Sequence, residues 1–408
     1  MRKLFVLIVL GTTTLIVAAS LLSKSLAQNS PSTLSGAMQP TAPGFKIGAP
    51  LSTIKLRPAI AEVKRIQYLS NGFIEASHAL VLIPKKDKTL QGILTLAQKV
   101  ATQTLAARSS LAVVDVSIYQ AEGYAGFGGP SPLLTVSVPR QKLGAFNQIK
   151  VSALDEYDHL WVNPVASPLP PQIEATGETP FGTPETLSKL VGNAADLKTE
   201  QQKALKEGGI RKGLFFQGSR KKPLIALTFD DGVHPLYTPL ILDSLRRTGA
   251  KATFFVVGRN VLAYPYFVRD LAREGHELAN HTFNHVRLVG LPVKVVREEL
   301  AQTNILIQSI TGEPVRFFRP PGGRYTRTIL KIAYSLGMST AFWTSDPADF
   351  NNPGSLVLET RLLRYLRPGG IVLLHDNAPQ TPPLLADFIN DARTAGIKMV
   401  TLETLAQL

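Results

Sequence analysis

Residues 224–249 read LIALTFDDGVHPLYTPLILDSLRRTG. A strand-like apolar run ends in two adjacent aspartates and a glycine, and a helical pattern follows over Thr238–Thr248. Gly249 then stands where a helix needs a residue with left-handed backbone geometry. A strand followed by an acidic turn and a helix is typical of a parallel strand with a crossover connection.

The same unit recurs to the end of the chain. Strand-like runs cover Leu224–Phe229, Ala252–Val257, His276–Asn280, Val315–Phe318, Ser339–Trp343, Ile371–Leu374 and Met399–Leu402. Helical patterns cover Thr238–Thr248, Tyr264–Glu274, Val293–Thr311, Thr326–Leu336, Ser355–Leu366 and Pro382–Ala395. The repeat predicts an α/β fold, a distorted (β/α) barrel of about seven parallel strands, with an open doubly wound sheet as the alternative.

Composition limits the chemistry. The 408 residues contain 44 Lys and Arg against 30 Asp and Glu, a formal net charge of +14, and no cysteine. The missing cysteines exclude a disulfide scaffold, a thiol nucleophile and thiolate metal sites, so a metal must be bound by Asp, Glu and the seven histidines. The positive charge forms no dense basic run with interleaved aromatics, so we expect no nucleic-acid partner.

The amino terminus carries an export pattern. Residues 1–27 combine a basic start, an apolar stretch over residues 4–22 and small residues before a cleavage point after Ala27, as secretory signals do. The apolar stretch is also long enough for an uncleaved membrane anchor. Either interpretation places the remainder outside the cytoplasm, in the periplasm, the cell wall or the medium.

The segment between the signal and the repeat divides by composition. Residues 28–58 are rich in Ser and Pro and predict a tether, whereas residues 59–164 predict a small α+β domain of unknown role. Residues 165–209 predict a Pro-rich linker and a polar helix. The repeat unit then occupies residues 210–408, the expected catalytic domain.

Polar clusters follow the predicted strands, and parallel folds place their chemistry at the carboxyl ends of strands. His281 and His285 are four residues apart, so both rings lie on one face if that segment is helical, and they could share a metal. Asp230 and Asp231 offer one carboxylate as a third ligand and one as a general base. Taken singly, each cluster has a plain structural explanation, but the set at one rim favours a catalytic site.

In this order, the clusters resemble the five motifs of the polysaccharide deacetylase family, carbohydrate esterase family 4, with its NodB-homology domain. TFDDG over residues 228–232 is similar to the first motif and HTFNH over residues 281–285 to the second. The resemblance implies one divalent metal ion, Zn²⁺ by preference, on Asp231, His281 and His285. It also implies that Asp230 is the catalytic base.

The other three motifs are RPP at residues 319–321, DPADF at residues 346–350 and LLH at residues 373–375. By resemblance, Arg319 holds the base, Asp349 orients the general acid His375, and the backbone N–H of Gly322 helps to bind the oxyanion. Gly322 stands where many members have Tyr, and Phe350 where Trp is usual. The residues expected to line the substrate groove are Pro320, Pro321, Trp343 and Phe350.

The resemblance implies a hydrolase that removes N-acetyl groups from amino sugars of an N-acetylated polysaccharide. We rank peptidoglycan N-acetylglucosamine above chitin oligomers. An esterase acting on O-acetylated xylan, or an amidase for a small amide, would use the same residues. A wall-binding module without catalytic activity is the alternative from another class, and the intact Asp, His and Arg set argues against it.

Overall fold

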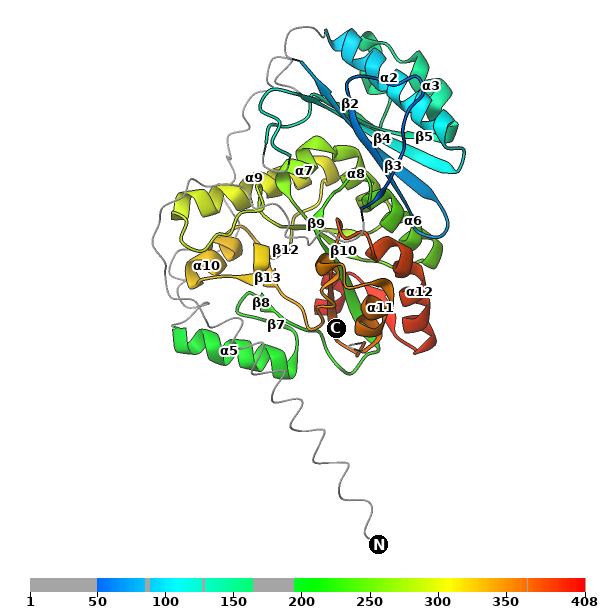
Figure 1. Cartoon of the computed structure of the whole chain (residues 1–408). Helices are drawn as coiled ribbons and strands as arrows, with labels where there is room; N and C mark the ends of the chain where they lie inside the picture. Colours follow the sequence, from blue (N-terminus) through cyan, green and yellow to red (C-terminus); the bar gives the residue numbers. More distant parts are fainter. Residues whose placement is uncertain (1–49, 85–88, 127–128, 164–193, 365, 408) are drawn as a thin grey trace.

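The computed structural model describes residues 50–84, 89–126, 129–163, 194–364 and 366–407, which form two domains (Figure 1). The predicted signal at 1–27, most of the predicted tether and residues 164–193 of the predicted linker lie outside the described residues. Among the described helices, none combines the length and apolarity that a bilayer crossing requires.

The first domain is one six-stranded sheet in the order β1 to β6. Its strands are β1 (Ser52–Thr53), β2 (Val63–Ser70), β3 (Glu75–Ile83), β4 (Leu111–Gln120), β5 (Leu134–Pro139) and β6 (Leu160–Val162). Only β3 and β4 pair in parallel, because α2 (Leu90–Ala107) crosses over between them. The small α+β domain is therefore present, and it begins at Ser52, inside the predicted tether, since β1 pairs with β2.

One face of this sheet is covered by helices. Thr89 caps α2 by accepting a hydrogen bond from the Gly92 N–H. The apolar side chains of α2, spaced three and four residues apart, are buried against the sheet. The short helix α3 (Leu143–Gln148) packs beside α2 on the same side (Figure 1).

The second domain contains the predicted repeat. Its strands are β7 (Ile210–Arg211), β8 (Leu214–Phe215), β9 (Leu224–Gly232), β10 (Thr253–Val256), β11 (Glu277–Asn280), β12 (Phe317–Phe318), β13 (Ser339–Ala341), β14 (Ile371–His375) and β15 (Lys398–Val400). Its helices are α5 (Ala194–Glu207), α6 (Thr238–Thr248), α7 (Gly258–Ala263), α8 (Pro265–Arg273), α9 (Val293–Thr311), α10 (Arg327–Ser335), α11 (Ser355–Arg364), α12 (Thr381–Thr394) and α13 (Leu402–Ala406). All seven predicted strands are present.

Several details differ from the prediction, and two concern the strands at the end and the edge of the sheet. The last strand ends at Val400 rather than at Leu402, because Thr401 caps α13 through its side chain. An eighth strand in parallel register, β8, pairs with β13. Its two residues are too few to show a period in the sequence.

The parallel sheet curls around its own interior. Its order is β14-β9-β10-β11-β12-β13-β8-β7, with β15 also paired to β9. A parallel bridge between Ser345 and Val372 joins the segment after β13 to β14. This bridge joins the two sides of the curled sheet, and the fold is the distorted barrel that the repeat predicts rather than an open sheet.

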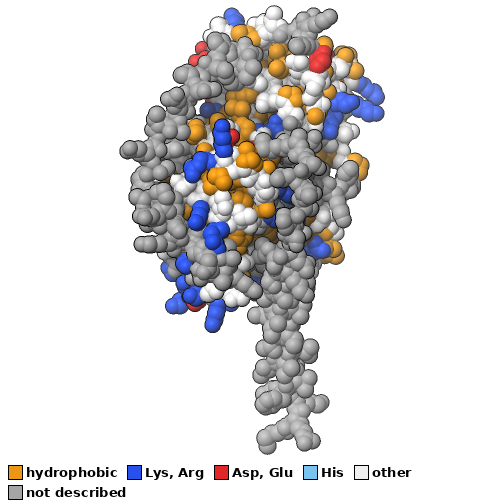
Figure 2. Space-filling model, turned by 90° about the vertical axis from the view of Figure 1, so that its left-hand side faces the viewer, with side chains coloured by type: hydrophobic (Ala, Val, Ile, Leu, Met, Phe, Trp, Pro, Cys, Tyr) orange, Lys and Arg blue, Asp and Glu red, His pale blue; other side chains and the backbone are white. Residues whose placement is uncertain are grey.

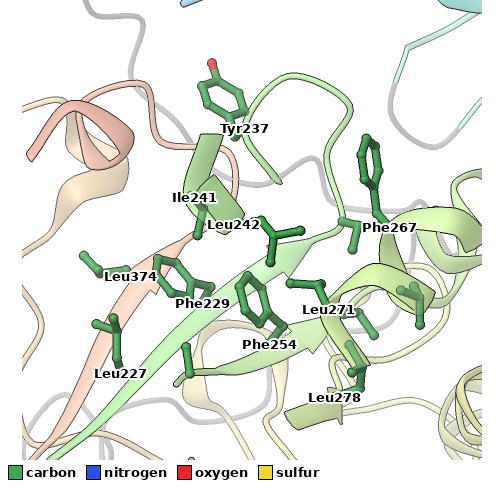
Figure 3. Close-up of a cluster of buried hydrophobic side chains, with 14 of the residues drawn as sticks. Leu227, Phe229, Tyr237, Ile241, Leu242, Phe254, Phe267, Leu271, Leu278 and Leu374 are labelled. Atoms are coloured by element: carbon green, nitrogen blue, oxygen red, sulfur yellow. The ribbon is translucent and has the colours of Figure 1, made fainter. Parts of the chain in front are cut away.

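Successive side chains of β9 point to opposite sides of the sheet, either to the outer apolar core or to the interior of the barrel. Leu227 and Phe229 point outward into the apolar cluster beneath α6 and α8, where Figure 3 shows them beside Phe254 and Leu374. Ala226 belongs instead to the cluster inside the barrel. Because side chains alternate along a strand, the Asp230 side chain points to the same inward side as Ala226. It lies near the carboxyl end of β9.

The uncovered face of the first sheet packs on α6, α7 and α8 of the second domain (Figure 1). The Asn71 side-chain amide donates to the Leu240 carbonyl at 3.0 Å and to Asp243 at 2.9 Å. The Thr135 hydroxyl donates to the Ala263 carbonyl at 2.5 Å. The two domains are thus joined by specific buried hydrogen bonds.

The basic charge is dispersed on the visible surface. On the face drawn in Figure 2, Lys and Arg side chains are spread among apolar side chains and outnumber the acidic ones. That distribution agrees with the diffuse charge in the sequence.

Candidate active site

Two neighbouring carboxylates stand at the end of β9. Asp230 and Asp231 are 4% and 5% exposed, so both are almost fully withdrawn from water. Asp231 has a φ of 69°, a left-handed conformation that non-glycine residues adopt at some cost. The turn directs the two carboxylates to different partners.

Asp231, His281 and His285 form the one cluster of possible metal ligands among the described residues, with donor atoms all within 4.8 Å of one another. The Asp231 Oδ1 atom lies 3.1 Å from His285 Nε2 and 3.5 Å from His281 Nε2. Ligand atoms around a tetrahedral zinc ion lie roughly 3.3 Å apart. The three donors, two nitrogens and one carboxylate oxygen, therefore fit a divalent ion such as Zn²⁺.

The segment that carries the two histidines is a loop, so the helix considered for His281 to His285 is wrong. Thr282 and His285 have φ values of 67° and 54°. The Glu299 carboxylate accepts hydrogen bonds from the Phe283 and Asn284 N–H groups at 3.0 and 2.8 Å, which fixes the loop. The rings still converge, with centroids 5.0 Å apart.

Further contacts orient the cluster. His281 Nδ1 lies 2.7 Å from the Arg319 carbonyl, which leaves its Nε2 directed toward the carboxylates. The Asn377 side-chain amide donates to Asp231 Oδ2 at 3.0 Å. Burial acts to raise the pKa of Asp231, but His285 and His281 outweigh it and hold that pKa well below its usual value.

Arg319 is the partner of the other carboxylate. Its side chain is 0% exposed, and its Nη1 donates to Asp230 Oδ1 at 2.6 Å and to the Thr228 hydroxyl at 2.9 Å. The guanidinium also donates to the Phe342 carbonyl at 3.0 Å and stacks 4.0 Å from the Phe255 ring centroid. The arginine is held on several sides and fixes Asp230 in position.

His375 and Asp349 form a second pair at the same rim. Asp349 Oδ1 lies 2.7 Å from His375 Nδ1, and Asp349 Oδ2 accepts from the Thr381 hydroxyl at 2.7 Å. Burial acts to lower the pKa of His375, but the charge and hydrogen bond of Asp349 prevail and raise it to about 10. These contacts favour the protonated form of the imidazole. The Phe350 ring lies edge-on, 5.2 Å from its centroid.

The Pro-rich turn closes the rim. Gly322 has a φ of 68°, and open space surrounds the position that a Cβ would take. At Gly323 a Cβ would lie 2.7 Å from the Trp343 ring, so glycine permits the close approach of that half-buried side chain. Pro320 and Pro321 are buried within the turn.

The structure brings together all the predicted catalytic and metal-binding residues, and it adds some that the sequence reasoning missed. Asn377 holds Asp231, Thr381 holds Asp349, and Thr228 holds Arg319. Asn377 lies two residues beyond His375, so its place after a strand end was a usable signal. Thr381 and Thr228 had no comparable signal in the sequence, because hydroxyl residues are common in strands and at helix starts.

Comparison with known proteins agrees with this geometry. A family model described as polysaccharide deacetylase matches residues 217–341. A peptidoglycan-N-acetylglucosamine deacetylase of Bacillus cereus is 36% identical over 187 residues, which cover 45% of this chain and 87% of the relative. The chain belongs to the polysaccharide deacetylase family.

Other relatives in the polysaccharide deacetylase family are similarly close. A chitooligosaccharide deacetylase of Sinorhizobium fredii is 36% identical over 158 residues, 38% of this chain and 74% of the relative. The solved structure of the Bc1960 peptidoglycan N-acetylglucosamine deacetylase is 30% identical, with a TM-score of 0.46, over 48% of this chain and 93% of that one. Family membership makes the protein a hydrolase of acetylated polysaccharide.

Proposed function

We propose that the enzyme removes N-acetyl groups from amino sugars of a cell-envelope polysaccharide, with peptidoglycan N-acetylglucosamine as the first substrate and chitin oligomers as the second. The observation that carries the proposal is the convergence of three units at one rim. They are the Asp231, His281 and His285 cluster, the Asp230–Arg319 pair and the His375–Asp349 pair.

The cluster would hold the family's divalent ion, and we propose Zn²⁺ because two imidazoles and one carboxylate suit it. Bound there, the ion would supply Lewis-acid polarisation of the acetamide carbonyl and of the attacking water. Asp230, held by Arg319, accepts the proton of that water as it attacks the carbonyl carbon. The Gly322 N–H donates to the oxyanion that develops on the carbonyl oxygen.

His375 completes the reaction as general acid. Its Nδ1 is engaged by Asp349, so the proton that it transfers to the leaving amine comes from Nε2. The raised pKa of His375 favours the protonated form that a general acid needs. The products are acetate and a free amine on the sugar. We assign Phe350 and Trp343 to the walls beside the acetyl group, with Pro320 and Pro321 shaping the turn.

We further propose that the protein is exported and acts in the periplasm, the cell wall or the medium. The basic and apolar pattern of residues 1–27 supports export, and residues 4–22 would serve as an anchor if the signal is not cleaved. The polymers named for the relatives suit such a location. The N-acetylated polysaccharide is the expected partner.

The test is acetate release from peptidoglycan, chitin oligomers and acetylated xylan, with bound metal measured in the same preparation. The proposal predicts acetate from the N-acetylated polymers and none after treatment with a chelator. Acetate from xylan alone would favour the esterase. Binding of polymer without acetate under any added metal would favour a module that only binds the wall.

A further inference from the structure

Helix α7 (Gly258–Ala263) lies between the sheet of the first domain and the barrel of the second (Figure 1). It has six residues, and helices of this length have little stability of their own. No side-chain hydrogen bond caps its start, and the first N–H groups and last carbonyls of any helix have no partner within it. The contacts that α7 makes with other segments therefore determine its position.

The amino-terminal end of α7 is bonded to the loop that carries two of the three metal ligands. The N–H groups of its first two residues donate to the carbonyls of Thr282 and Phe283 at 2.9 and 3.0 Å. Those carbonyls belong to the segment between His281 and His285. A Cβ at Gly258 would lie 2.6 Å from the Phe283 side chain, so glycine permits the close approach of helix and loop. The start of α7 therefore supports the segment between the two histidines.

A side chain of α7 reaches the third metal ligand. The Asn260 side-chain amide donates to the Asp231 backbone carbonyl at 3.2 Å. Asp231 and Thr282 both have positive φ values, 69° and 67°. Such backbone conformations persist only where the surrounding structure holds them. Because α7 donates to the carbonyl of each of these two residues, it supports both segments that supply ligands.

The carboxyl-terminal end of α7 is bonded to the first domain. The Thr135 hydroxyl of β5 donates to the Ala263 carbonyl at 2.5 Å, and both residues are buried. Tyr264, the residue after α7, is also buried, and its hydroxyl lies 3.1 Å from the Ser117 hydroxyl of β4. The first domain thus supplies partners for the end of α7 that the helix itself cannot supply.

Arg259 provides a further link between α7 and the first domain. Its side chain donates to the Gly129 carbonyl, in the connection between β4 and β5. The first domain is therefore bonded to both the start and the end of α7, and α7 is bonded in turn to the segments of all three metal ligands.

We propose that the first domain, by docking on α7, holds the metal-ligand loops in the geometry that binds the ion, with Asn260 as a positioning residue for Asp231. Contacts behind metal ligands change metal affinity, because ligands that are already held in place lose less freedom when the ion binds. The first domain would then act on the site without touching the ion or the substrate. The inference rests on the proposed function, since it requires the cluster to bind a divalent ion.

The direct test is the Kd for Zn²⁺, measured by competition with a chelating dye at a temperature where circular dichroism shows every variant to be folded. Asn260→Leu keeps the size of the side chain and removes the donor, so the Kd should rise about tenfold. Thr135→Val removes only a hydroxyl, in the domain that carries none of the three ligands, and valine suits a strand. Its Kd for Zn²⁺ should rise about threefold, as expected for the loss of one hydrogen bond.

His159→Gln is the matched control. His159 Nε2 lies 2.8 Å from Asp270 Oδ2, a contact between the same two domains that falls on α8 rather than on α7. The substitution should lower the free energy of unfolding and leave the Kd for Zn²⁺ at the wild-type value. Because Thr135→Val and His159→Gln each remove one docking contact, a difference in Kd between them reports on α7 and not on stability.

The outcomes separate this inference from the proposed function. A wild-type Kd in both Asn260→Leu and Thr135→Val would overturn the role of α7 and leave the function standing. A rise in Asn260→Leu alone would support the positioning residue and overturn the part of the first domain. An equal rise in all three variants would overturn the specific role of α7, because any loss of docking would then weaken the site. If the wild type bound no divalent ion, the proposed function itself would be wrong.

Discussion

Polar side chains are buried both at the catalytic rim and at the junction between the two domains. The two regions differ in the charge of the side chains that they bury. At the rim, charged groups face charged partners, as in Arg319 with Asp230 and His375 with Asp349. At the junction, most contacts are between neutral groups, such as the Thr135 hydroxyl and the Ala263 carbonyl. Burying charge is costly, so its concentration at the rim indicates a chemical purpose, whereas docking requires only satisfied hydrogen bonds.

Two buried histidines show the difference most clearly. Burial lowers the pKa of His78 at the junction to about 3, with the Arg65 charge adding to the effect. At the rim, burial also acts to lower the pKa of His375, yet Asp349 raises it to about 10. Nearby carboxylates therefore set the direction in which the pKa of a buried imidazole is shifted: they act on His375, and none contributes to the shift of His78.

The largest expected effect comes from removing the charge of Asp230. Asp230→Asn should lower acetate release by about 10³-fold, because the attacking water loses its general base. Metal content should not change, since Asp231 and the histidines remain. The matched control is Asp376→Asn directly after β14, a second buried carboxyl, whose pKa burial holds well above its usual value. Equal rates in the two variants would show that Asp230 is not the base.

Removal of Arg319 tests whether charge at the rim must be paired. Arg319→Met leaves Asp230 buried without its cation, so we expect activity to fall by about 10²-fold and the free energy of unfolding to fall by about 3 kcal/mol. Denaturant unfolding and initial rates measure the two quantities. Arg316→Met removes an exposed pair with Glu403 and should change stability by less than about 1 kcal/mol. Similar losses in both variants would contradict the distinction between the two regions.

At the junction, an added charge is expected to lower the free energy of unfolding. Asn71→Asp places a carboxylate where the amide now donates to Asp243 at 2.9 Å, so we expect stability to fall by about 2 kcal/mol. The kcat on a short substrate should stay at the wild-type value. Asn147→Asp, an exposed change in the same domain, serves as the control for unfolding experiments. If Asn71→Asp unfolds at the wild-type denaturant concentration, the docking contacts are not as described.

The smallest effect concerns the ion pair between His159 and Asp270 at the junction of the two domains. Burial acts to lower the pKa of His159, but hydrogen bonds to Asp270 and Asp158 outweigh it and raise that pKa. The stabilisation is therefore complete below about pH 6.5, the ordinary value, and is lost as the pH rises through the folded-state value. The wild type should lose about 1 kcal/mol relative to His159→Gln over that rise. If the free energies of unfolding of the wild type and of His159→Gln changed in parallel from pH 6 upward, the prediction would be wrong.

Much of the fold was predictable because its repeat is regular. The bounds of α6 and α9 agree with the sequence to the residue, since Gly249 and Gly312 end them in left-handed geometry. Strand ends also located the polar clusters, because parallel strands bring their carboxyl ends to one rim. In these helices and strand ends, the local sequence pattern and the tertiary structure specify the same geometry.

The remainder depends on contacts that a linear pattern does not carry. The loop at His281 to His285 is set by the Glu299 side chain from α9, so spacing alone suggested a helix. The two-residue strand β8 is too short to have a period. The docking of the first domain on α6 depends on hydrogen bonds of Asn71, and asparagine is a residue type that is common in ordinary turns.

The central claim is that the rim is a metal-dependent deacetylase site built on Asp231, His281 and His285. The most direct measurement is acetate release from N-acetylglucosamine oligomers by the wild type and His281→Ala, before chelation, after it and after Zn²⁺ is returned, with bound metal quantified each time. We predict that wild-type activity is lost with the metal and returns with a single equivalent, while His281→Ala binds less metal and does not recover. Acetate release at the full rate from metal-free protein, or unchanged metal content in His281→Ala, would contradict the account.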